Sequence, residues 1–596
     1  MKKLKFILDY AKPDDKRIIA IFFDVAIYAL AMLISPLILS IMVDNVIQGI
    51  PADNQMITAI LQRLGGDAHL RNNLWIGSLL MLAVYILIAF GVHRRTINCG
   101  LVSETFAENI RNAVYDHMQK LPFAYHKQKD SGDLLQRCTS DIDQIRRFLA
   151  SQISEMLYSI LIVCFAAAIL FSKHAKLAAI SVVLLPLILI ASLIFYTKSK
   201  KIFLDCDIAE SKMMAVLQEN LNAMRVVKAF HQEKVEIDKF EEKNEDYRVK
   251  LFRLVNALGI FWNISDLIGM IQILIMIIFG IQFAVAQQLS VGTFFVFLTY
   301  ISMIIWPIRQ LGRILADMGK VSVSVTRIKE ILDEEAEDLE AGIKPEIIGD
   351  IVFDHVSFNY EDSEEHTLND VSFHIEANTR VAIMGPTGSG KSSLIHLLNG
   401  IYDYKGGSIR IDGHELRTIS KAWLRKKVQI VLQEPFLYSK TIYENIHLAA
   451  SKSERDEIIK AAKTASIHNV IEEFEKGYDT EVGEKGVTLS GGQKQRLAIA
   501  RSLLLKSPIV IFDDSLSALD SKTDAMIQDA LNQLDYPVTT LMITHRINTA
   551  RSADLILVLD HGKLIQSGTH ETLIHEEGLY KRIYEIQSEG GESHGE

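Results

Sequence analysis

The sequence predicts a multidomain protein in which an all-α polytopic membrane domain precedes an α/β domain. Long apolar runs fill the chain up to about residue 320, whereas the remainder has an ordinary soluble composition. The first half is therefore expected to meet lipid and the second half water. In the second half, the apolar run 380–384 leads into a glycine-rich loop and then a helix-like stretch. This is the strand-loop-helix order of a phosphate-binding loop.

Six stretches in the first half reach the roughly 20 residues that a spanning helix needs. They are Ile18–Val43, Leu74–Val92, Phe148–Phe171, Leu177–Tyr196, Leu254–Ala286 and Val291–Ala316. About fifty mostly polar residues with helical periodicity separate the second stretch from the third, and again the fourth from the fifth. The connections after the third and fifth stretches are very short, so the long loops all lie on one side of the membrane.

The distribution of lysine and arginine assigns that side. Both long loops are rich in these residues, while the opposite connections hold only Arg63, Arg71, Lys173 and Lys176. The long loops and both chain termini are therefore expected in the cytoplasm, with the protein in a plasma membrane. Helices that continue beyond the bilayer would carry these loops about 30–40 Å into the cytosol. The basic start is not followed by a small-residue cleavage site, so the first apolar helix is expected to stay in the protein.

The turning points of the long loops, near residues 121–134 and 219–230, mix aliphatic or aromatic side chains with charge. Such surfaces suit docking on a soluble domain, so we expect two coupling loops there. A solvated helical hairpin without a partner is the alternative. An acidic run predicts a solvated linker at residues 331–349, which places the membrane domain at 1–330 and the soluble domain at 350–590.

Ionisable residues inside the apolar stretches are few, and they include Asp24, Asp266 and Arg309. Asp266 is the most interior, and a carboxylate that faces a water-filled cavity there could select cationic substrates. A structural hydrogen bond or a position on the cytosolic side is the alternative. The net charge of −10 gives no reason to expect nucleic acid. The four scattered cysteines predict neither a disulfide framework nor a zinc site.

The glycine-rich loop carries the clearest chemistry. Its residues are Gly385, Pro386, Thr387, Gly388, Ser389, Gly390, Lys391 and Ser392. Glycines let the backbone curl so that successive N–H groups point at phosphate oxygens, and the following helix adds positive potential. Lys391 would then reach the β- and γ-phosphates, and Ser392 would ligate Mg²⁺. A glycine-serine turn before an ordinary helix is the alternative.

Three further segments of the soluble half suit a nucleotide. The strand-like run 353–360 ends on Tyr360, which could stack on adenine, although packing is the commoner role of such a residue. The buried run 508–512 ends in Asp513, which can hold Mg²⁺ through water. The segment 489–493 is a glycine-bearing helix start with a hydroxyl, and thus a second anion-binding terminus. One γ-phosphate cannot easily be held by two helix N-termini of a single domain that lie so far apart in sequence.

These motifs in combination resemble the ATP-binding-cassette (ABC) family, and specifically exporter half-transporters with a six-helix domain fused to an α/β P-loop NTPase. The resemblance covers nearly the whole chain. It implies ATP and Mg²⁺ as cofactors and a head-to-tail dimer, in which each ATP lies between one chain's loop 385–392 and the other chain's signature. The signature residues are Ser490, Gly491, Gly492 and Gln493, preceded by the segment 480–486.

The resemblance also assigns individual roles. Tyr360 is the adenine-stacking residue, Gln433 contacts Mg²⁺ together with Ser392 and Asp513, and the D-loop lies at 517–520. The catalytic positions are Gln433, His545 and Asp514. Asp514 departs from the family pattern, which has glutamate there to polarise the attacking water.

Loss of one methylene at Asp514 draws the carboxylate back by about 1.5 Å, and displacements near 1 Å at a reacting centre can cost about 10²-fold in rate. The site on this chain's own loop is therefore expected to bind ATP and hydrolyse it poorly, while its complete signature serves a partner. This combination resembles heterodimeric exporters with one weak site. An aspartate that works adequately in a homodimer is the alternative.

The sequence thus predicts ATP-driven export of amphipathic compounds, such as drugs, by this chain together with a non-identical half-transporter in the lipid bilayer. A homodimeric lipid or peptide exporter is a second interpretation. A regulatory subunit that senses nucleotide without transporting is a third, and the complete signature and both coupling loops argue against it.

Overall fold

The computed structural model describes residues 2–51, 55–360, 366–450, 452–483, 486, 488–516 and 520–592. The chain forms two compact units. The first unit comprises Met1–Gln119 and Asp130–Glu334, and the second comprises Lys120–Lys129 and Glu335–Glu596. The short segment Lys120–Lys129 therefore packs with the second unit, although the chain on both sides of it belongs to the first.

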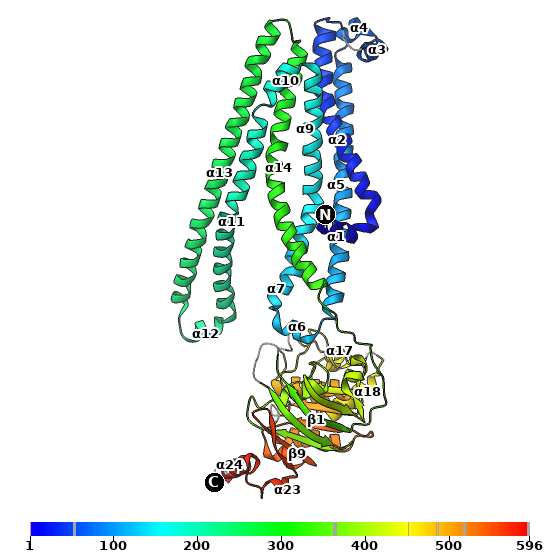
Figure 1. Cartoon of the computed structure of the whole chain (residues 1–596), viewed down its shortest axis with the longest axis vertical. Helices are drawn as coiled ribbons and strands as arrows, with labels where there is room; N and C mark the ends of the chain where they lie inside the picture. The colour runs from blue at the N-terminus through cyan, green and yellow to red at the C-terminus, as the bar shows by residue number, and fades with distance from the viewer. Residues whose placement is uncertain are drawn as a thin grey trace. The chain divides into compact units, whose positions relative to one another are not determined.

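The first unit is helical throughout (Figure 1). Its helices are α1 (Lys2–Ala11), α2 (Asp15–Ile41), α3 (Gln55–Arg63), α4 (Gly66–Asn72), α5 (Trp75–Met118), α7 (Ser131–Gln136), α8 (Ile142–Arg147), α9 (Ile153–Lys173), α10 (Ala175–Val182), α11 (Leu185–Asn222), α12 (Met224–Ala229), α13 (Glu233–Val285) and α14 (Val291–Leu332). Turns of π-helix extend α2 through Met42–Ile47 and join α7 to α9 through Arg137–Asp141 and Phe148–Gln152.

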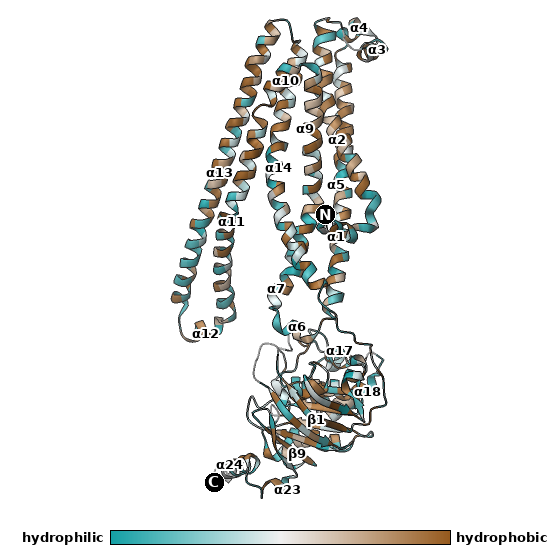
Figure 2. Cartoon of the chain, viewed as in Figure 1, coloured by the Kyte–Doolittle hydropathy of each residue, from teal (hydrophilic) through white to brown (hydrophobic). Residues whose placement is uncertain are grey.

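Six helical segments of the described residues are long and apolar enough to cross a membrane, which confirms the six predicted spans. The helices continue well beyond the apolar stretches, as expected: α5 has 44 residues and α13 has 53. Figure 2 shows the change in composition along α11 and α13, which are hydrophobic in the middle and hydrophilic toward α12. Length and hydropathy together therefore define a membrane part and a polar extension within single helices.

Close backbone contacts and a shared apolar core hold the spanning helices together. A Cβ at Gly312 of α14 would lie 2.4 Å from the Cβ of Ser192 on α11, so only glycine permits this approach. The core is formed by α2, α9, α10, α11, α13 and α14 and includes Leu33, Ile162 and Tyr300. Many large apolar side chains of α13, such as Leu267, stay exposed on the outer side of the unit, which suits contact with lipid.

The ionisable residues of the spans have partners inside the unit. Asp24 is buried and accepts a hydrogen bond of 3.0 Å from Asn98 Nδ2 on α5. For this residue the alternative of a structural hydrogen bond therefore applies. Asp266 of α13 pairs with Arg309 of α14 at 2.7 Å. Asp44, which the sequence did not single out, accepts bonds of 2.6 Å each from Ser290 Oγ and from the backbone N–H of Gly292. It thereby joins the end of α2 to the first turn of α14.

The second unit contains two sheets. Its strands are β1 (Ile351–Phe358), β2 (Leu368–Ile375), β3 (Arg380–Met384), β4 (Gly406–Ile411), β5 (His414–Glu415), β6 (Val428–Val431), β7 (Ile509–Asp513), β8 (Thr539–Ile543), β9 (Leu555–Asp560) and β10 (Lys563–Gly568). The smaller sheet has the order β2-β1-β4-β5, and the larger has the order β10-β9-β3-β8-β7-β6. Strands β3, β6, β7, β8 and β9 are parallel, and β7 and β8 are buried along their whole length. Helices cover such central strands on both faces, which explains their continuous apolar sequences.

The helices of the second unit complete three hydrophobic cores among the described residues. They are α6 (Phe123–Gln128), α15 (Lys391–Leu398), α16 (Lys421–Lys427), α17 (Ile442–His447), α18 (Arg455–Thr464), α19 (His468–Glu472), α20 (Gly491–Leu503), α21 (Ser521–Asn532), α22 (Ile547–Arg551), α23 (His570–Leu573) and α24 (Leu579–Glu592). One core lies between the two sheets and α15. A second lies between α17, α18 and α20 and the strands β6 and β7. A third lies between α22, α23 and α24 and the strands β3 and β9.

The acidic run after α14 is not solvated throughout, contrary to the prediction of a solvated linker. Glu337 is 9% exposed and receives hydrogen bonds of 2.8 and 2.9 Å from Arg425 and one of 2.9 Å from Lys421. Burial acts to raise the pKa of Glu337, but the bonds from Arg425 and Lys421 outweigh it and hold this pKa below its ordinary value. Part of the linker is therefore packed against the basic residues of α16. This contact could not be predicted from the sequence, because α16 lies more than eighty residues further along the chain.

Candidate functional site

Four parallel strands bring the predicted phosphate-site residues together. Strands β3, β8, β7 and β6 are neighbours in the larger sheet, with Ile383 opposite Ile543 and Ile543 opposite Asp513. The glycine loop follows β3, His545 follows β8, Asp514 follows β7 and Gln433 follows β6. Because the carboxyl ends of parallel strands meet at one edge of a sheet, these segments converge there. This edge is where open α/β sheets bind ligands.

Two glycines of the loop are required by the backbone. Gly385 has φ +146°, and a Cβ there would lie 2.1 Å from the carbonyl oxygen of Leu559 on β9. Gly390 has φ +98° at the start of α15, and a Cβ there would lie 2.8 Å from the carbonyl oxygen of Thr367. At Gly388, by contrast, a Cβ would meet nothing within 4 Å, so its positive φ is the constraint. The loop therefore curls tightly against β9 and β2 and leaves open space above Gly388.

Lys391 is 7% exposed and lies inside this curl. Its ammonium donates to the carbonyl oxygens of Gly385 and Pro386 at 2.9 and 2.7 Å. Burial lowers the pKa of Lys391, and the nearby carboxylates of Asp514 and Asp513 oppose that shift. The ammonium also lies 3.4 Å from Ser389 Oγ. A buried cation whose hydrogen-bond partners are neutral oxygens is suited to bind a polyanion.

The groups suited to Mg²⁺ also lie together. Ser392 Oγ donates to Asp513 Oδ1 at 3.2 Å, so a hydroxyl and a carboxylate face the same point beside the loop. Burial raises the pKa of Asp513 and the charge of Asp514 adds to this, while the Ser392 hydrogen bond and the Lys391 charge act against it. Among the described residues no cluster of three or more histidine, cysteine or acidic side chains could hold a metal alone. This fits Mg²⁺, which is usually bound by one or two protein oxygens together with substrate phosphates.

Gln433 and Asp514 meet directly across the edge of the sheet. Gln433 Nε2 donates to Asp514 Oδ2 at 3.2 Å, although the two residues are 81 positions apart. Asp514 has φ +47°, which turns the chain sharply after β7. His545 is exposed, and its carbonyl oxygen accepts a hydrogen bond of 2.7 Å from Gln587 Nε2 of α24. The structure thus brings the predicted glutamine into contact with the unusual aspartate.

The signature residues begin α20, whose later apolar residues, such as Leu497, pack in the core with α17 and α18. Ser490 caps α20, with Ser490 Oγ accepting from Gln493 N at 3.3 Å and Gln493 Oε1 accepting from Ser490 N at 2.8 Å. This capping box leaves the helix N-terminus regular and its dipole directed outward. Gln495, which is 1% exposed, donates to the carbonyl oxygen of Leu432 at 3.1 Å. The signature helix is thereby joined to the segment that carries Gln433.

Comparison with known proteins identifies the family. A family model described as "ABC transporter transmembrane region" matches residues 18–308, and one described as "ABC transporter" matches residues 368–517. This chain belongs to the ABC transporter family. It is an exporter-type member in which a membrane domain is fused to an ATP-hydrolysing domain, and it works in the lipid bilayer.

Three similar proteins cover most of this ABC transporter. The chain is 32% identical over 99% of its length to the "Putative multidrug export ATP-binding/permease protein YgaD" of Bacillus subtilis, whose whole length is covered. It is 34% identical over 81% of its length to the "ATP-dependent lipid A-core flippase" of Idiomarina loihiensis, of which 83% is covered. The solved structure of a bacterial Atm1-family ABC exporter with ATP bound has a TM-score of 0.83 at 25% identity, and 96% of this chain and 99% of that chain are covered.

In this transporter Tyr360 joins α6 to the nucleotide-binding half. Its ring contacts Phe358 and Tyr402, and its hydroxyl lies 2.8 Å from Ser393 Oγ on α15. Two residues of α6 complete the cluster: Lys127 Nζ lies 4.2 Å from the Tyr360 ring centroid, and Phe123 packs edge-on against Tyr402 at 5.9 Å. Tyr360 therefore has the packing role that was the alternative to adenine stacking. It also presents an aromatic face, which the Lys127 ammonium covers.

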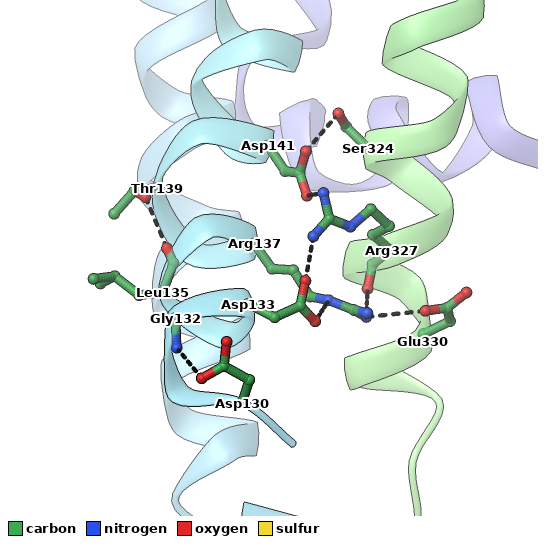
Figure 3. Close-up of polar contacts among 10 residues, drawn as sticks. All are labelled: Asp130, Gly132, Asp133, Leu135, Arg137, Thr139, Asp141, Ser324, Arg327 and Glu330. Carbon is green, nitrogen blue, oxygen red and sulfur yellow. Dashed lines mark hydrogen bonds and ion pairs between the residues drawn. The ribbon is translucent and has the colours of Figure 1, made fainter. Parts of the chain in front are cut away.

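A charged network lies in the first unit, where the chain leaves α6 (Figure 3). Arg137 donates to Asp133 Oδ2 at 2.8 Å and, across to α14, to Glu330 Oε2 at 2.9 Å. Arg327 of α14 pairs with Asp133 and with Asp141 Oδ2, the latter at 3.2 Å. The network thus connects α7 and the following π-helical turn to the last turns of α14.

The structure also shows residues that sequence reasoning missed. The contacts just described are made by Lys127, Gln495, Arg137 and Arg327. Their charge or amide groups alone gave no signal, because the partners Tyr360, Leu432, Glu330 and Asp133, respectively, are distant in sequence. Of the predicted motif residues, Ser517–Leu519 of the D-loop and Glu484 and Lys485 before the signature lie outside the described residues.

Proposed function

We propose that this chain is one subunit of a heterodimeric ABC exporter for amphipathic compounds, with a hydrolytically weak site on its own glycine loop. The observation that carries the proposal is Asp514, which stands where exporters of this family have glutamate. Its carboxylate is about 1.5 Å shorter in reach, and it is engaged by Gln433 at 3.2 Å. A water molecule placed for a glutamate would therefore be poorly polarised, at a cost of about 10²-fold in rate.

The residues of the loop would bind ATP as follows. Backbone N–H groups of residues 387–391 and the N-terminus of α15 would hold the phosphates, and Lys391 would exchange its bonds to Gly385 and Pro386 for phosphate oxygens. Ser392 and Asp513 hold Mg²⁺, with Gln433 as a further contact. When bound, this ion neutralises charge on the β- and γ-phosphates. His545 contacts the γ-phosphate, and Tyr360 stacks on adenine.

The signature of this chain would act on the partner's nucleotide. Ser490 to Gln493 form a regular, capped helix start, whose N–H groups and dipole suit a γ-phosphate. Two chains arranged head to tail place this terminus opposite the partner's loop. The competent site of the pair is then built from the partner's carboxylate and this chain's signature.

Two coupling loops would carry the movement to the membrane helices. The first, α6, packs on the nucleotide-binding half of its own chain through Phe123 and Lys127. The second, around α12, presents an exposed Phe230 and a groove of about 290 Å³ lined by Ala223, Val226 and Val227. We assign the partner's nucleotide-binding domain to this groove. Sandwiching of ATP would then switch the membrane cavity from inward- to outward-facing, and hydrolysis would reset it.

The domain boundaries and the orientation belong to the same proposal. The membrane domain comprises residues 1–330, the linker 331–349 and the nucleotide-binding domain 350–590. Both termini lie in the cytoplasm of a cell with the transporter in its plasma membrane, as the positive charge of the long loops supports. Amphipathic drugs are the proposed substrates, because YgaD is named a putative multidrug export protein.

The experiment compares two substitutions in the complex of this chain with its copurifying partner. Ser490→Ala should remove most ATPase activity, because it disables the signature at the competent site. Asp514→Asn should change turnover much less. If this chain alone hydrolyses ATP at the full rate of any mixture and Asp514→Asn silences it, the homodimer interpretation is correct and the proposed asymmetry is wrong.

Lipid export is the second candidate, since a relative at 34% identity is named a lipid A-core flippase. ATP-dependent movement of a fluorescent lipid by the reconstituted protein, without efflux of amphipathic dyes, would favour it. A regulatory subunit would show neither activity while still binding nucleotide.

A further inference from the structure

We propose that Trp262, Asp266 and Trp306 form a binding site for lipophilic aromatic amines on the membrane helices of this transporter. The inference rests on the proposed export of amphipathic compounds, and it names their chemical class and the side chains that recognise them.

Four side chains from two helices form one cluster. Trp262 and Asp266 are four residues apart on α13, and Trp306 and Arg309 are three apart on α14, so each pair shares a helix face. The two indole rings are stacked, with centroids 5.6 Å apart and an angle of 21° between their planes. Arg309 joins the aromatic and acidic parts, because its Nη1 lies 2.7 Å from Asp266 Oδ1 and its guanidinium carbon lies 5.2 Å from the Trp262 ring centroid.

The accessible charge of this cluster is negative. The Asp266 side chain is 55% exposed and Trp306 is 56% exposed, whereas the Arg309 side chain is only 6% exposed. The guanidinium therefore lies behind the carboxylate and holds it in one orientation. A ligand that approaches meets a carboxylate and an indole face, which both attract cations, before it meets the arginine. An anion would meet the carboxylate first and be repelled.

The position along α13 argues that this surface faces water. Asp266 lies twelve residues, or about 18 Å, from Leu254 and nineteen residues, or about 28 Å, from Val285, and thus inside the apolar stretch. Ionisable side chains at such positions face a bundle interior or a water-filled cavity, because contact with lipid is costly. On α14, polar or amphipathic residues recur at the helical spacing of Ser302, Trp306, Arg309 and Arg313. Such a stripe of side chains faces water rather than the hydrocarbon of the bilayer.

The ligand class follows from the two recognition elements. A planar aromatic ring can stack on the exposed indole of Trp306, and an amine or quaternary nitrogen can lie against Asp266 and the ring faces. A neutral aromatic molecule has only the stacking contribution. A charge-assisted contact of this kind corresponds to about a tenfold or greater difference in affinity between the two.

Binding can be measured by fluorescence titration of the full transporter, purified with its partner into lipid nanodiscs, using ethidium as the cationic probe and pyrene as the neutral one. Asp266→Asn should weaken ethidium binding about tenfold and leave pyrene binding unchanged, and Asp266→Glu should restore most of it. Trp306→Ala should weaken both probes. Glu242→Gln, which neutralises an exposed carboxylate on the polar extension of the same helix, is the matched control and should change neither.

The outcomes separate this inference from the proposed function. Basal ATPase activity reports whether each variant is folded and whether the protein is an active transporter at all, so its absence from the unsubstituted protein would count against the proposed function alone. Unchanged ethidium affinity in a folded Asp266→Asn variant overturns the amine site. Equal loss of both probes also overturns it, because the ion pair would then only anchor the two helices. If Asp266→Asn does not fold, Trp306→Ala decides the question: weaker binding of both probes supports the site, and unchanged affinity for both probes overturns it.

Discussion

Replacing Arg327 by glutamine should loosen the charged network between α7 and the end of α14 (Figure 3). Arg327 pairs with two carboxylates, and one of them, Asp141, is only 7% exposed. Removal of one partner from a buried ion pair typically costs about 3–5 kcal/mol. Here Ser324 still donates to Asp141 at 2.9 Å, Arg137 still pairs with Asp133, and Arg327 itself is 24% exposed. We therefore expect a loss of about 2 kcal/mol.

Thermal unfolding of the purified full-length transporter, followed by tryptophan fluorescence, measures this effect. A change of about 2 kcal/mol lowers the Tm by about 4 °C in a unit of this size. The matched control is Lys329→Gln on the same helix, which removes an ion pair with Asp333 in which both side chains are more than half exposed. Such surface pairs contribute about 0–1 kcal/mol, so the control should shift the Tm by about 2 °C or less.

A double-mutant cycle tests the physical reason. Asp141→Asn removes the buried charge, so Arg327→Gln should cost much less in that background than in the unsubstituted protein. The reasoning is refuted if Arg327→Gln and Lys329→Gln have equal effects, or if the cost of Arg327→Gln is the same in both backgrounds. Either result would mean that Asp141 does not depend on Arg327 in the folded protein.

Three further predictions concern the second unit. Gly385→Ala should reduce binding of a fluorescent ATP analogue at least tenfold, because the new Cβ would lie 2.1 Å from a backbone carbonyl oxygen. Gly388→Ala should reduce this binding only a few-fold, through strain at its φ of +84°. Equal losses of affinity in the two variants would contradict this prediction. Phe123→Ala should leave basal ATPase activity intact and reduce its stimulation by transported dyes several-fold, while Leu135→Ala, at a residue that is 65% exposed, should change neither quantity. Retained stimulation in Phe123→Ala would argue against coupling through α6. Glu337→Gln should cost about 2 kcal/mol of stability at pH 7. Because the folded-state pKa of Glu337 lies below its ordinary value of 4.5, the stabilisation by its carboxylate is complete above pH 4.5 and disappears as the pH falls through the folded-state pKa. The free energies of unfolding of the two proteins, measured with denaturant, should therefore converge in acid. A difference that is independent of pH would disprove the assignment.

The sequence by itself determined those structural features that depend only on residues close together along the chain. The spanning helices follow from the length and hydropathy of continuous runs, and the glycine loop follows from a strand, three glycines and Lys391 in one short segment. Backbone conformation at Gly385 and Gly390 is a local property, so their spacing was sufficient to predict a curl before α15. The position of Asp514 at the edge of the sheet was predictable for the same reason, because it lies one residue after the strand.

Only the tertiary structure decided which distant groups meet. The sequence showed Asp266 and Arg309 as isolated charges in separate apolar stretches, and their pairing depends on the rotation of α13 against α14. In the same way, α16 converts the acidic Glu337 from a solvated residue into a buried ion pair. The packing of Lys127 on Tyr360 brings a membrane-domain loop of the sequence into the second unit. Such contacts join residues that are tens to hundreds of positions apart, and helix rotation and strand order, which no local pattern encodes, determine whether their side chains face one another.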